Sequence, residues 1–398
     1  MPDSQNSTAD MHFSTELLAA GQLDLSIQQA WHTLLTGSKS PEKVFQTPEY
    51  FDFISQIPNK DNSQEILVAK DPDSQKIMAI VPLRTGRRTL CLNIGHYTFL
   101  HLRLRTIALL GSIPLVGDEP RLQDTLVELI FKNFPEKNTI AMQSLPKDSD
   151  FYRHLQSSKN IQKKYGIFIK DGWRACHTTP LPESYTAYLD QFKSKKRYNL
   201  NRQLKLLEKN AGLLQLVRVE NPEQIPELVA AIKKLVPAHI VKSFLNEKQF
   251  INLAEKKIKL SYILKCNEVP HAIIIGMKAE GTFHIHNILY AQDTAEYSPG
   301  TSVLHLAIED LINNLKISLI DYGYGSPEHS HQSSNVPNLR GHVFLYQKTW
   351  SNRLMFSTYS VYSGLVGRSK KLLARMQTAM GPLRHKTPLP IALCWTLL

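Results

Sequence analysis

The chain has 398 residues, of which 42% are hydrophobic and 21% are charged. This balance is ordinary for a folded protein and excludes a largely disordered chain, and the length is sufficient for two domains. No apolar run approaches the ~20 residues that a membrane-spanning helix needs. The polar N-terminus has neither the basic nor the apolar region of a secretory signal, so we expect none.

The net charge is +12 and the isoelectric point is near 9.3. A basic surface attracts anions such as nucleic acid, an anionic membrane or a phosphorylated cofactor, although it can also serve solubility alone. The four cysteines, Cys91, Cys176, Cys266 and Cys394, are far apart and form no CxxC pair. They fit neither a disulfide framework nor a zinc site, and a cytoplasmic location is therefore expected.

The first part of the chain predicts mixed α and β structure after a disordered tail at 1–14. Apolar periodicity predicts helices at 25–36, 47–54 and 121–134, and strands at 65–70, 76–84, 89–92, 106–110 and 139–143. Pro48 stands at the start of the second helix, where a proline is tolerated because the first helical amide has no intrahelical partner.

The second part repeats this order of elements without a repeat at the level of residues. A basic helix at 182–210 precedes a strand at 214–219, helices at 222–235 and 246–257, and strands at 260–265, 271–278 and 282–290. Polar breaks between these last strands predict consecutive antiparallel pairing. A helix at 300–315 and a strand at 317–322 follow. Glycines and prolines at 165–182 predict a domain boundary there.

A polar loop is expected at 326–338 and a strand at 342–350. The last predicted helix, 352–380, places basic residues beside an apolar stripe that includes Leu354, Val361 and Leu365. Such a helix can lie on an anionic bilayer or pack against the protein's own sheet, and the sequence favours neither. Prolines from Pro382 onward end it.

The turn Ser298-Pro299-Gly300-Thr301 opens the helix at 300–315. The first amides of a helix lack intrahelical partners and lie at the positive end of the helix dipole, which suits a phosphate or pyrophosphate. We therefore expect Ser298 and the amides of Gly300, Thr301, Ser302 and Val303 to bind a nucleotide-type cofactor. The alternative is a plain helix cap formed by Ser298 or Thr301.

These segments resemble the GNAT-type acyltransferases of the FemAB-like and CelD/BcsL group. The resemblance covers roughly residues 44–350. It rests on a basic helix (Phe192-Lys-Ser-Lys-Lys-Arg-Tyr-Asn-Leu-Asn-Arg), a Tyr-Ser-Pro-Gly turn before a helix, and Asp321-Tyr-Gly-Tyr-Gly at a strand end. Gln46-Thr-Pro-Glu-Tyr matches the aromatic motif near the start of that group.

The resemblance implies tandem GNAT-like folds in the α+β class, each a mixed, mostly antiparallel sheet flanked by helices. We expect a degenerate N-terminal domain at 15–165, an acyltransferase domain at 166–350, and a basic helix with a proline-containing tail at 351–398. Two features depart from the group. The glycine-rich pyrophosphate loop Q/R-x-x-G-x-G/A is absent, and the 326–340 segment separates Asp321 from Tyr346-Gln347-Lys348.

The candidate catalytic residues are Asp321, His286 and Tyr346. Asp321 closes an apolar strand beside glycines, and a histidine at position 286 can take a proton at neutral pH. The candidate substrate-binding residues are Arg197 and Asn201 on the basic helix, His284 on the strand, and Tyr322 with Gly323. Each has a structural alternative: a turn aspartate, solvated histidines, or an exposed basic face. Glu328, His329 and His331 lack a fourth ligand spacing, so no metal is expected.

The resulting hypothesis is an acetyl or acyl transfer from an acyl-CoA to an amine or hydroxyl acceptor, by direct attack in a ternary complex. The group implies a role in polysaccharide or cell-envelope biosynthesis, and the basic helix at 352–380 would allow peripheral contact with the inner face of a membrane. Two alternatives remain: a FemAB-like transferase that uses aminoacyl-tRNA, and a non-catalytic GNAT-like binding module at a membrane surface. Nucleic acid is expected only in the first of these.

Overall fold

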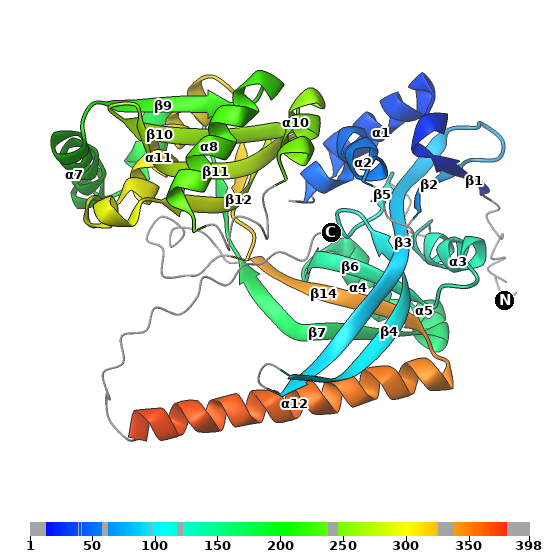
Figure 1. Ribbon diagram of the computed structural model, residues 1–398. Helices are drawn as coiled ribbons and strands as arrows, with labels where there is room; N and C mark the ends of the chain where they lie inside the picture. Colours follow the sequence, from blue (N-terminus) through cyan, green and yellow to red (C-terminus); the bar gives the residue numbers. More distant parts are fainter. Residues whose placement is uncertain are drawn as a thin grey trace, which may run out of the picture.

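The computed structural model describes residues 13–38, 40, 42–57, 63–94, 97–117, 122–237, 246–324 and 338–379. Within these ranges the chain forms two β-sheets with helices packed against them (Figure 1). This arrangement confirms the predicted mixed fold of two units, each a largely antiparallel sheet flanked by helices.

The first sheet has eight strands, with the order β1-β2-β3-β4-β6-β14-β7 and β5 paired to β3. All neighbours are antiparallel except β4 and β6. The strands are β1 (Ser14–Ala19), β2 (Gln64–Lys70), β3 (Ile77–Ile94), β4 (Tyr97–Leu109), β5 (Leu115–Val116), β6 (Thr139–Pro146), β7 (Tyr165–Cys176) and β14 (Asn338–Gln347).

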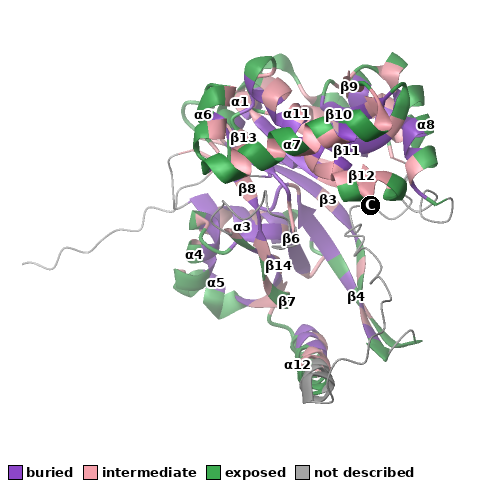
Figure 2. Ribbon diagram, turned by 90° about the vertical axis from the view of Figure 1, so that its left-hand side faces the viewer, coloured by how far each residue is buried: buried purple, intermediate pink, exposed green. Residues whose placement is uncertain are grey.

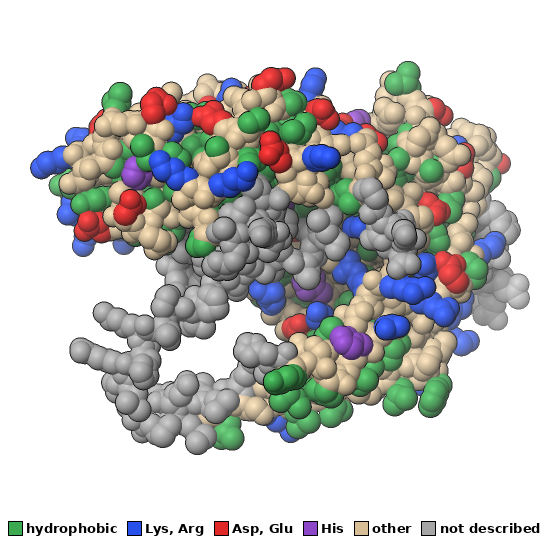
Figure 3. Space-filling view, in the orientation of Figure 1, with side chains coloured by type: hydrophobic (Ala, Val, Ile, Leu, Met, Phe, Trp, Pro, Cys, Tyr) green, Lys and Arg blue, Asp and Glu red, His purple; other side chains and the backbone are tan. Residues whose placement is uncertain are grey.

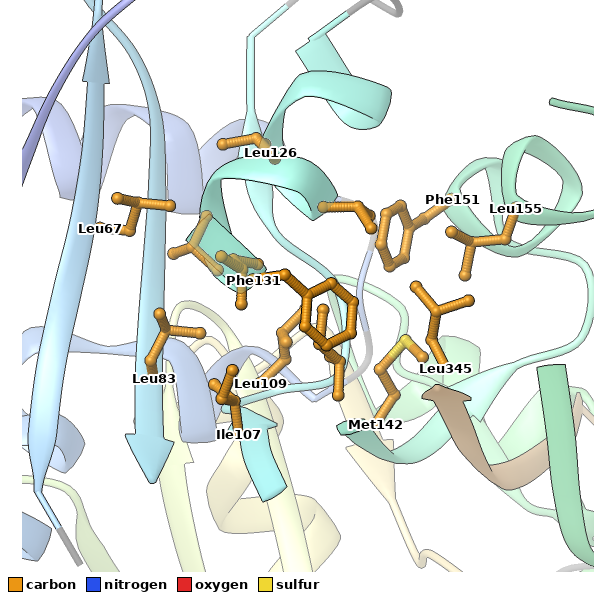
Figure 4. Close-up of a cluster of buried hydrophobic side chains, with 14 of the residues drawn as sticks. Leu67, Leu83, Ile107, Leu109, Leu126, Phe131, Met142, Phe151, Leu155 and Leu345 are labelled. Atoms are coloured by element: carbon orange, nitrogen blue, oxygen red, sulfur yellow. The ribbon is translucent and has the colours of Figure 1, made fainter. Parts of the chain in front are cut away.

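Helices cover this sheet because each presents one apolar face to it. Leu126 and Phe131 of α3 (Leu122–Asn133) pack with Leu83, Met142 and other strand residues in one buried cluster (Figure 4). Apolar side chains of α4 (Asp150–Ser157) and α5 (Lys159–Lys164) pack in the same cluster. On a second cluster, Trp31 of α1 (Leu25–Gly37) meets α2 (Pro48–Ser55).

The second sheet has six strands in the order β8-β13-β12-β11-β10-β9. They are β8 (Thr178–Pro180), β9 (Leu214–Val219), β10 (Lys259–Cys266), β11 (Val269–Ala279), β12 (Thr282–Tyr290) and β13 (Leu319–Asp321). One face packs on α6 (Tyr185–Asp190), α7 (Ser194–Ala211) and α11 (Pro299–Asn313), and the other on α8 (Ile225–Leu235) and α10 (Glu247–Glu255). Both faces of the sheet are therefore buried (Figure 2).

Two strands lie in a different sheet from the one that the sequence suggested. The stretch 165–182, predicted as a boundary, contains the long strand β7, and both β7 and β14 hydrogen-bond within the first sheet. The division between the sheets therefore does not coincide with the predicted boundary at 165/166. Gly172 marks a local turn of β7, with φ +75°, and not a linker.

The C-terminal helix α12 (Trp350–Ala379) lies under the first sheet, at the end of the molecule away from the second sheet (Figure 1). Phe356 and Tyr359 pack on Phe344 and Phe168 of the sheet, while Leu354 on the opposite side is exposed. The alternative that this helix packs against the protein's own sheet is thus correct for the face that carries Phe356 and Tyr359, and not for the face that carries Leu354. None of the described helices, α12 included, is long and apolar enough to cross a bilayer.

We predict that Phe356→Ala lowers the free energy of unfolding by about 3 kcal/mol, because it opens a cavity between α12 and the sheet. Leu354→Ala on the same helix is the control and changes it by less than about 0.5 kcal/mol, since that side chain is exposed. Urea denaturation of both variants measures the difference. Equal effects of the two substitutions would show that α12 is not docked as described.

Candidate functional site

Strands β12 and β13 part soon after they begin to pair. They are parallel neighbours from Thr282 with Leu319 to His284 with Asp321. Beyond that point β12 continues to Tyr290 paired with β11, and no described strand pairs with its other edge. The backbone groups of that edge are therefore available to an extended ligand.

A β-bulge lies at the parting point. The register between β11 and β12 shifts between Ile275 and Gly276, which leaves His286 as the additional residue on β12. Gly276 is required here because an added Cβ would lie 2.5 Å from the carbonyl oxygen of His284. Bulges of this kind re-aim side chains and are frequent beside active sites.

Helix α11 begins against the free end of β12. An added Cβ on Gly300 would lie 3.2 Å from Cδ1 of Tyr290 and 3.6 Å from Cγ2 of Ile288. On the other side, Gln203 of α7 donates from Nε2 to Oγ of Ser298 at 3.3 Å. The predicted cofactor turn, the free strand edge and the basic helix therefore meet at one place.

The amides at the start of α11 are only partly free. Those of Thr301 and Ser302 donate to the carbonyl oxygen of Ser298, at 3.0 and 3.1 Å. Pro299 has no amide hydrogen, and the amide of Gly300 has no partner among the described residues. Ser298 adopts a left-handed conformation, with φ +56°, and its side chain does not cap the helix. The capping alternative through Ser298 Oγ is therefore wrong, and Gly300 is left as the principal free donor.

Asp321 lies in a buried network of charges between the two sheets. Nη1 of Arg340, on β14 of the first sheet, donates to Oδ2 of Asp321 at 2.8 Å and to Oε1 of Glu42 at 3.0 Å. Nδ1 of His284 lies 3.2 Å from the same Oδ2. The second carboxylate oxygen accepts from the amide of Gly323 at 2.9 Å. Asp321 and Arg340 are both fully buried.

The protonation states of this network follow from its contacts. Burial alone would raise the pKa of Asp321, but Arg340 and His284 outweigh it and hold that pKa well below its usual range. Burial would lower the pKa of His284, yet the hydrogen bond and charge of Asp321 raise it. Burial raises the pKa of Glu42 despite Arg340. Asp321 is therefore a poor proton acceptor, because it is already ionised, paired and inaccessible.

His286 has a different environment from His284, although their ring centroids are 5.0 Å apart. Phe45, from the N-terminal part of the chain, makes T-shaped ring contacts with both histidines. Burial, together with His284 and Lys259, holds the pKa of His286 well below its usual value. The imidazole is therefore neutral at pH 7 and half-buried, and it stands beyond the last paired residue of β12.

Tyr346 is not brought to this site. It lies on β14 six residues after Arg340, which is about 20 Å along a strand. Its ring stacks on Phe356 with centroids 4.3 Å apart and crosses Gly166, where an added Cβ would be 2.3 Å from Cζ. The side chain borders a separate hollow of about 400 Å³ on the first sheet. The catalytic role predicted for Tyr346 does not fit this position.

The remaining predicted residues have the following positions and contacts. Arg197 pairs with Asp190, with Nη1 2.9 Å from Oδ1, while Asn201 is exposed on the same helix. Tyr322 is buried in the core of the second sheet, and burial raises its pKa to about 12. Gly323 has φ +60° and forms the turn after β13. The suggested cluster of Glu328, His329 and His331 lies outside the described residues.

Sequence reasoning missed two members of the Asp321 network that distant segments supply: Arg340 from β14 of the first sheet, and Glu42 from the turn before the 3-10 helix Lys43–Gln46. Arg340 and Glu42 are distant in sequence from Asp321, and no local pattern links them. His177 is buried beside Gly323, and neither of its ring nitrogens has a hydrogen-bond partner among the described residues. Lys259 is fully buried, and burial lowers its pKa to about 7. A lysine between Ile258 and Leu260 in an apolar run was the available signal for that residue.

Residues 194–330 match the family model described as acetyltransferase (GNAT) domain. The match begins with α7, ends just after β13, and includes β12, the bulge and the start of α11. No curated protein sequence is significantly similar to the chain.

Solved structures are similar in fold at low sequence identity. FemX has a TM-score of 0.54 at 10% identity and covers 83% of this chain and 97% of its own. A conserved protein of unknown function from Bacteroides thetaiotaomicron has a TM-score of 0.51 at 10% identity, with coverages of 85% and 100%. A tandem GNAT protein from the clavulanic acid pathway has a TM-score of 0.47 at 13% identity, with coverages of 84% and 98%. Residues 194–330 thus match the model of a GNAT acetyltransferase domain, a kind of domain that uses an acyl-CoA as its donor.

Proposed function

We propose that the protein transfers an acetyl group from acetyl-CoA to an amine or hydroxyl acceptor at the point where β12 and β13 part. The observation that carries this proposal is the free edge of β12, beside the His286 bulge and the start of α11. The pantetheine arm of the donor would pair with that edge. An amide of β12 would hold the thioester carbonyl and stabilise the oxyanion that forms on attack.

The pyrophosphate would meet the start of α11, where the amide of Gly300 and the positive end of the helix dipole favour an anion. Arg197 and Asn201 of α7, one turn apart, would add contacts to the phosphates or to the acceptor. Because Thr301 and Ser302 already donate to Ser298, the turn supplies fewer amides than a glycine-rich loop would. We therefore expect modest affinity for the donor.

His286 is our candidate general base. It stands next to the parting of the strands, and a neutral imidazole can accept the proton that the attacking amine or hydroxyl loses. The acceptor attacks the thioester carbonyl, coenzyme A leaves as the thiol, and no acyl-enzyme forms. His177 is the alternative base, since its ring nitrogens are unpartnered. Asp321 acts as a positioning residue: it contacts His284 directly and ties β13 to Arg340 of the first sheet.

The acceptor belongs to the part of the proposal that rests on sequence alone. The CelD/BcsL resemblance supports a sugar or another cell-envelope component, modified in the cytoplasm at the inner face of a membrane. The three described cysteines are all free thiols, which is compatible with that compartment. Transfer from aminoacyl-tRNA is the alternative. This alternative requires that the protein bind tRNA with an affinity that falls steeply as the salt concentration rises, whereas the acetyl-CoA proposal requires no tRNA binding.

We predict that Gly300→Asp weakens acetyl-CoA binding at least tenfold, about 1.4 kcal/mol. The added carboxylate repels the pyrophosphate, while a negative charge at the start of a helix does not destabilise the helix itself. Gly300→Ala is the control, because it adds the same Cβ beside Tyr290 without the charge. Calorimetric titration compares the two. If both variants bind acetyl-CoA equally well, the pyrophosphate does not bind at this turn.

We predict that His286→Gln lowers kcat about 100-fold while acetyl-CoA binding changes less than twofold, within the usual range for loss of a general base. In the unaltered enzyme, kcat is expected to stay level above pH 6.5, because the pKa of His286 lies well below that value. His177→Gln is the comparison. If it abolishes turnover and His286→Gln does not, the base is His177.

We predict that Asp321→Asn lowers the free energy of unfolding by about 3 kcal/mol at pH 6, because it leaves Arg340 buried with one carboxylate fewer. The depressed pKa of Asp321 makes its stabilisation complete above its ordinary value of 3.8 and lost as the pH falls further. The raised pKa of His284 makes its stabilisation complete below 6.5 and lost at higher pH. The loss of stability at acidic pH that comes from Asp321 and the loss above pH 6.5 that comes from His284 should both be smaller in Asp321→Asn.

Urea denaturation between pH 3 and 8 measures these changes. Asp190→Asn is the control, since it removes an exposed ion pair and should change stability by less than ~0.5 kcal/mol. Unchanged stability with lost turnover in Asp321→Asn would instead make Asp321 the catalytic base.

A further inference from the structure

The β3–β4 hairpin and α12 together expose a large apolar surface. At the hairpin tip, Ile94 is 71% exposed, Tyr97 83% and Phe99 55%. The neighbouring helix exposes five more large side chains: Trp350, Leu354, Val361, Leu365 and Leu372. A monomeric soluble protein rarely exposes this much contiguous apolar surface without a binding role.

The exposed side chains of α12 lie along one line. At ~100° per residue, Leu354, Val361, Leu365 and Leu372 fall within about 40° of one another. Phe356 and Tyr359, which pack on the first sheet, point to the opposite side of the helix. The helix is therefore apolar on two faces, and the sheet buries only one of them.

The hairpin tip is attached to the helix, so the two form one surface. The amide of Asn93 donates to Oη of Tyr362 at 2.8 Å, and that hydroxyl donates back to the carbonyl oxygen of Asn93 at 2.7 Å. Phe99 and Tyr362 have ring centroids 6.0 Å apart. Figure 3 shows hydrophobic side chains gathered in the lower part of the molecule, where Figure 1 places the hairpin tip and α12.

The charge of both segments is entirely basic. Residues 77–117 contain five arginines and no aspartate or glutamate, and residues 350–379 contain five lysines and arginines and again no acidic residue. Arg353, Arg368 and Lys371 are exposed on α12, and Arg103 and Arg105 on the hairpin. Within these two segments the apolar side chains are flanked only by positive charge, which suits an interface between hydrocarbon and anionic head groups; Asp171 of β7 accepts a hydrogen bond from Tyr359, on the face of α12 that packs on the sheet.

We propose that the tip of the β3–β4 hairpin and the outer face of α12 form a single docking surface for an anionic lipid bilayer. The surface lies at the end of the molecule away from the second sheet, so docking leaves the acetyltransferase domain clear of the membrane (Figure 1). The inference does not depend on the identity of the acceptor, or on whether acetyl transfer takes place.

The charge pattern also argues against other occupants. A second copy bound through the same surface would bring like charges together. The remainder of the chain, 380–398, is itself basic and free of acidic residues, so it has no electrostatic attraction to this surface. RNA would satisfy the arginines but would leave aliphatic Leu354, Val361, Leu365 and Leu372 without apolar contacts.

The test is sedimentation of the full chain with vesicles of phosphatidylcholine alone and of phosphatidylcholine with phosphatidylglycerol. We expect binding only to the anionic vesicles, with weakening as ionic strength rises from ~0.1 M to ~1 M and the Debye length falls from ~10 to ~3 Å. Val361→Asp with Leu365→Asp, and separately Tyr97→Ser with Phe99→Ser, should each lower the bound-to-free ratio at least tenfold. All four positions are exposed, so unchanged melting is expected.

Leu213→Asp is the matched control, an equally exposed leucine in the second unit, and should bind vesicles as the unaltered protein does. The proposal is overturned if neither vesicle binds the protein, or if the double variants bind unchanged. It is also overturned if vesicles do not bind and Arg353→Glu with Arg368→Glu abolishes binding to tRNA, which would make the surface a nucleic-acid site. The proposal also fails if the protein does not bind vesicles but forms concentration-dependent dimers that Val361→Asp abolishes. That result would make the surface a contact between two copies of the chain.

Discussion

The ion pair between Arg340 and Asp321 is the interaction on which the arrangement of the two sheets depends. Arg340 belongs to β14 of the first sheet and Asp321 to β13 of the second, and both side chains are fully buried. Glu42 and His284 complete the network. Two buried charges are costly to desolvate, so the network stabilises the protein only while its partners remain paired. It thereby fixes the position of β13 beside β12, and with it the point at which the two strands part.

This dependence explains why the candidate site spans the whole chain. The donor edge, the bulge at His286 and the start of α11 belong to the second unit. Arg340 behind Asp321 comes from the first sheet, and Phe45 against His286 comes from a short 3-10 helix, Lys43–Gln46, in the N-terminal part of the chain. Sequence reasoning located the local features, because antiparallel strands, a proline-glycine turn and an amphipathic helix are each encoded by adjacent residues. The strands at 260–290, the helix that begins near Gly300 and the similarity of residues 194–330 to a GNAT acetyltransferase domain were predicted correctly.

The contacts between distant segments could not be predicted in the same way. In the sequence, Arg340 resembles any arginine in a strand, and the residues adjacent to it do not indicate that it pairs with Glu42 and Asp321. For the same reason the sequence predicts a shared site for Tyr346 and Asp321, although β14 places Tyr346 in the first sheet and against Gly166. Glycines and prolines near 165–182 suggested a linker, whereas backbone pairing with β14 makes that stretch a strand. Local propensity yields to tertiary pairing at such positions.

The central claim is that acetyl-CoA binds along the free edge of β12 with its pyrophosphate at Gly300. Hydrogen–deuterium exchange of the full chain with and without acetyl-CoA tests it most directly, because a bound pantetheine arm protects the amides with which it pairs. The account predicts slower exchange in residues 285–290 and at Gly300, with no change around Tyr346. Unchanged exchange on β12 together with protection near Gln156 and Lys348, which border the hollow on the first sheet, would contradict it.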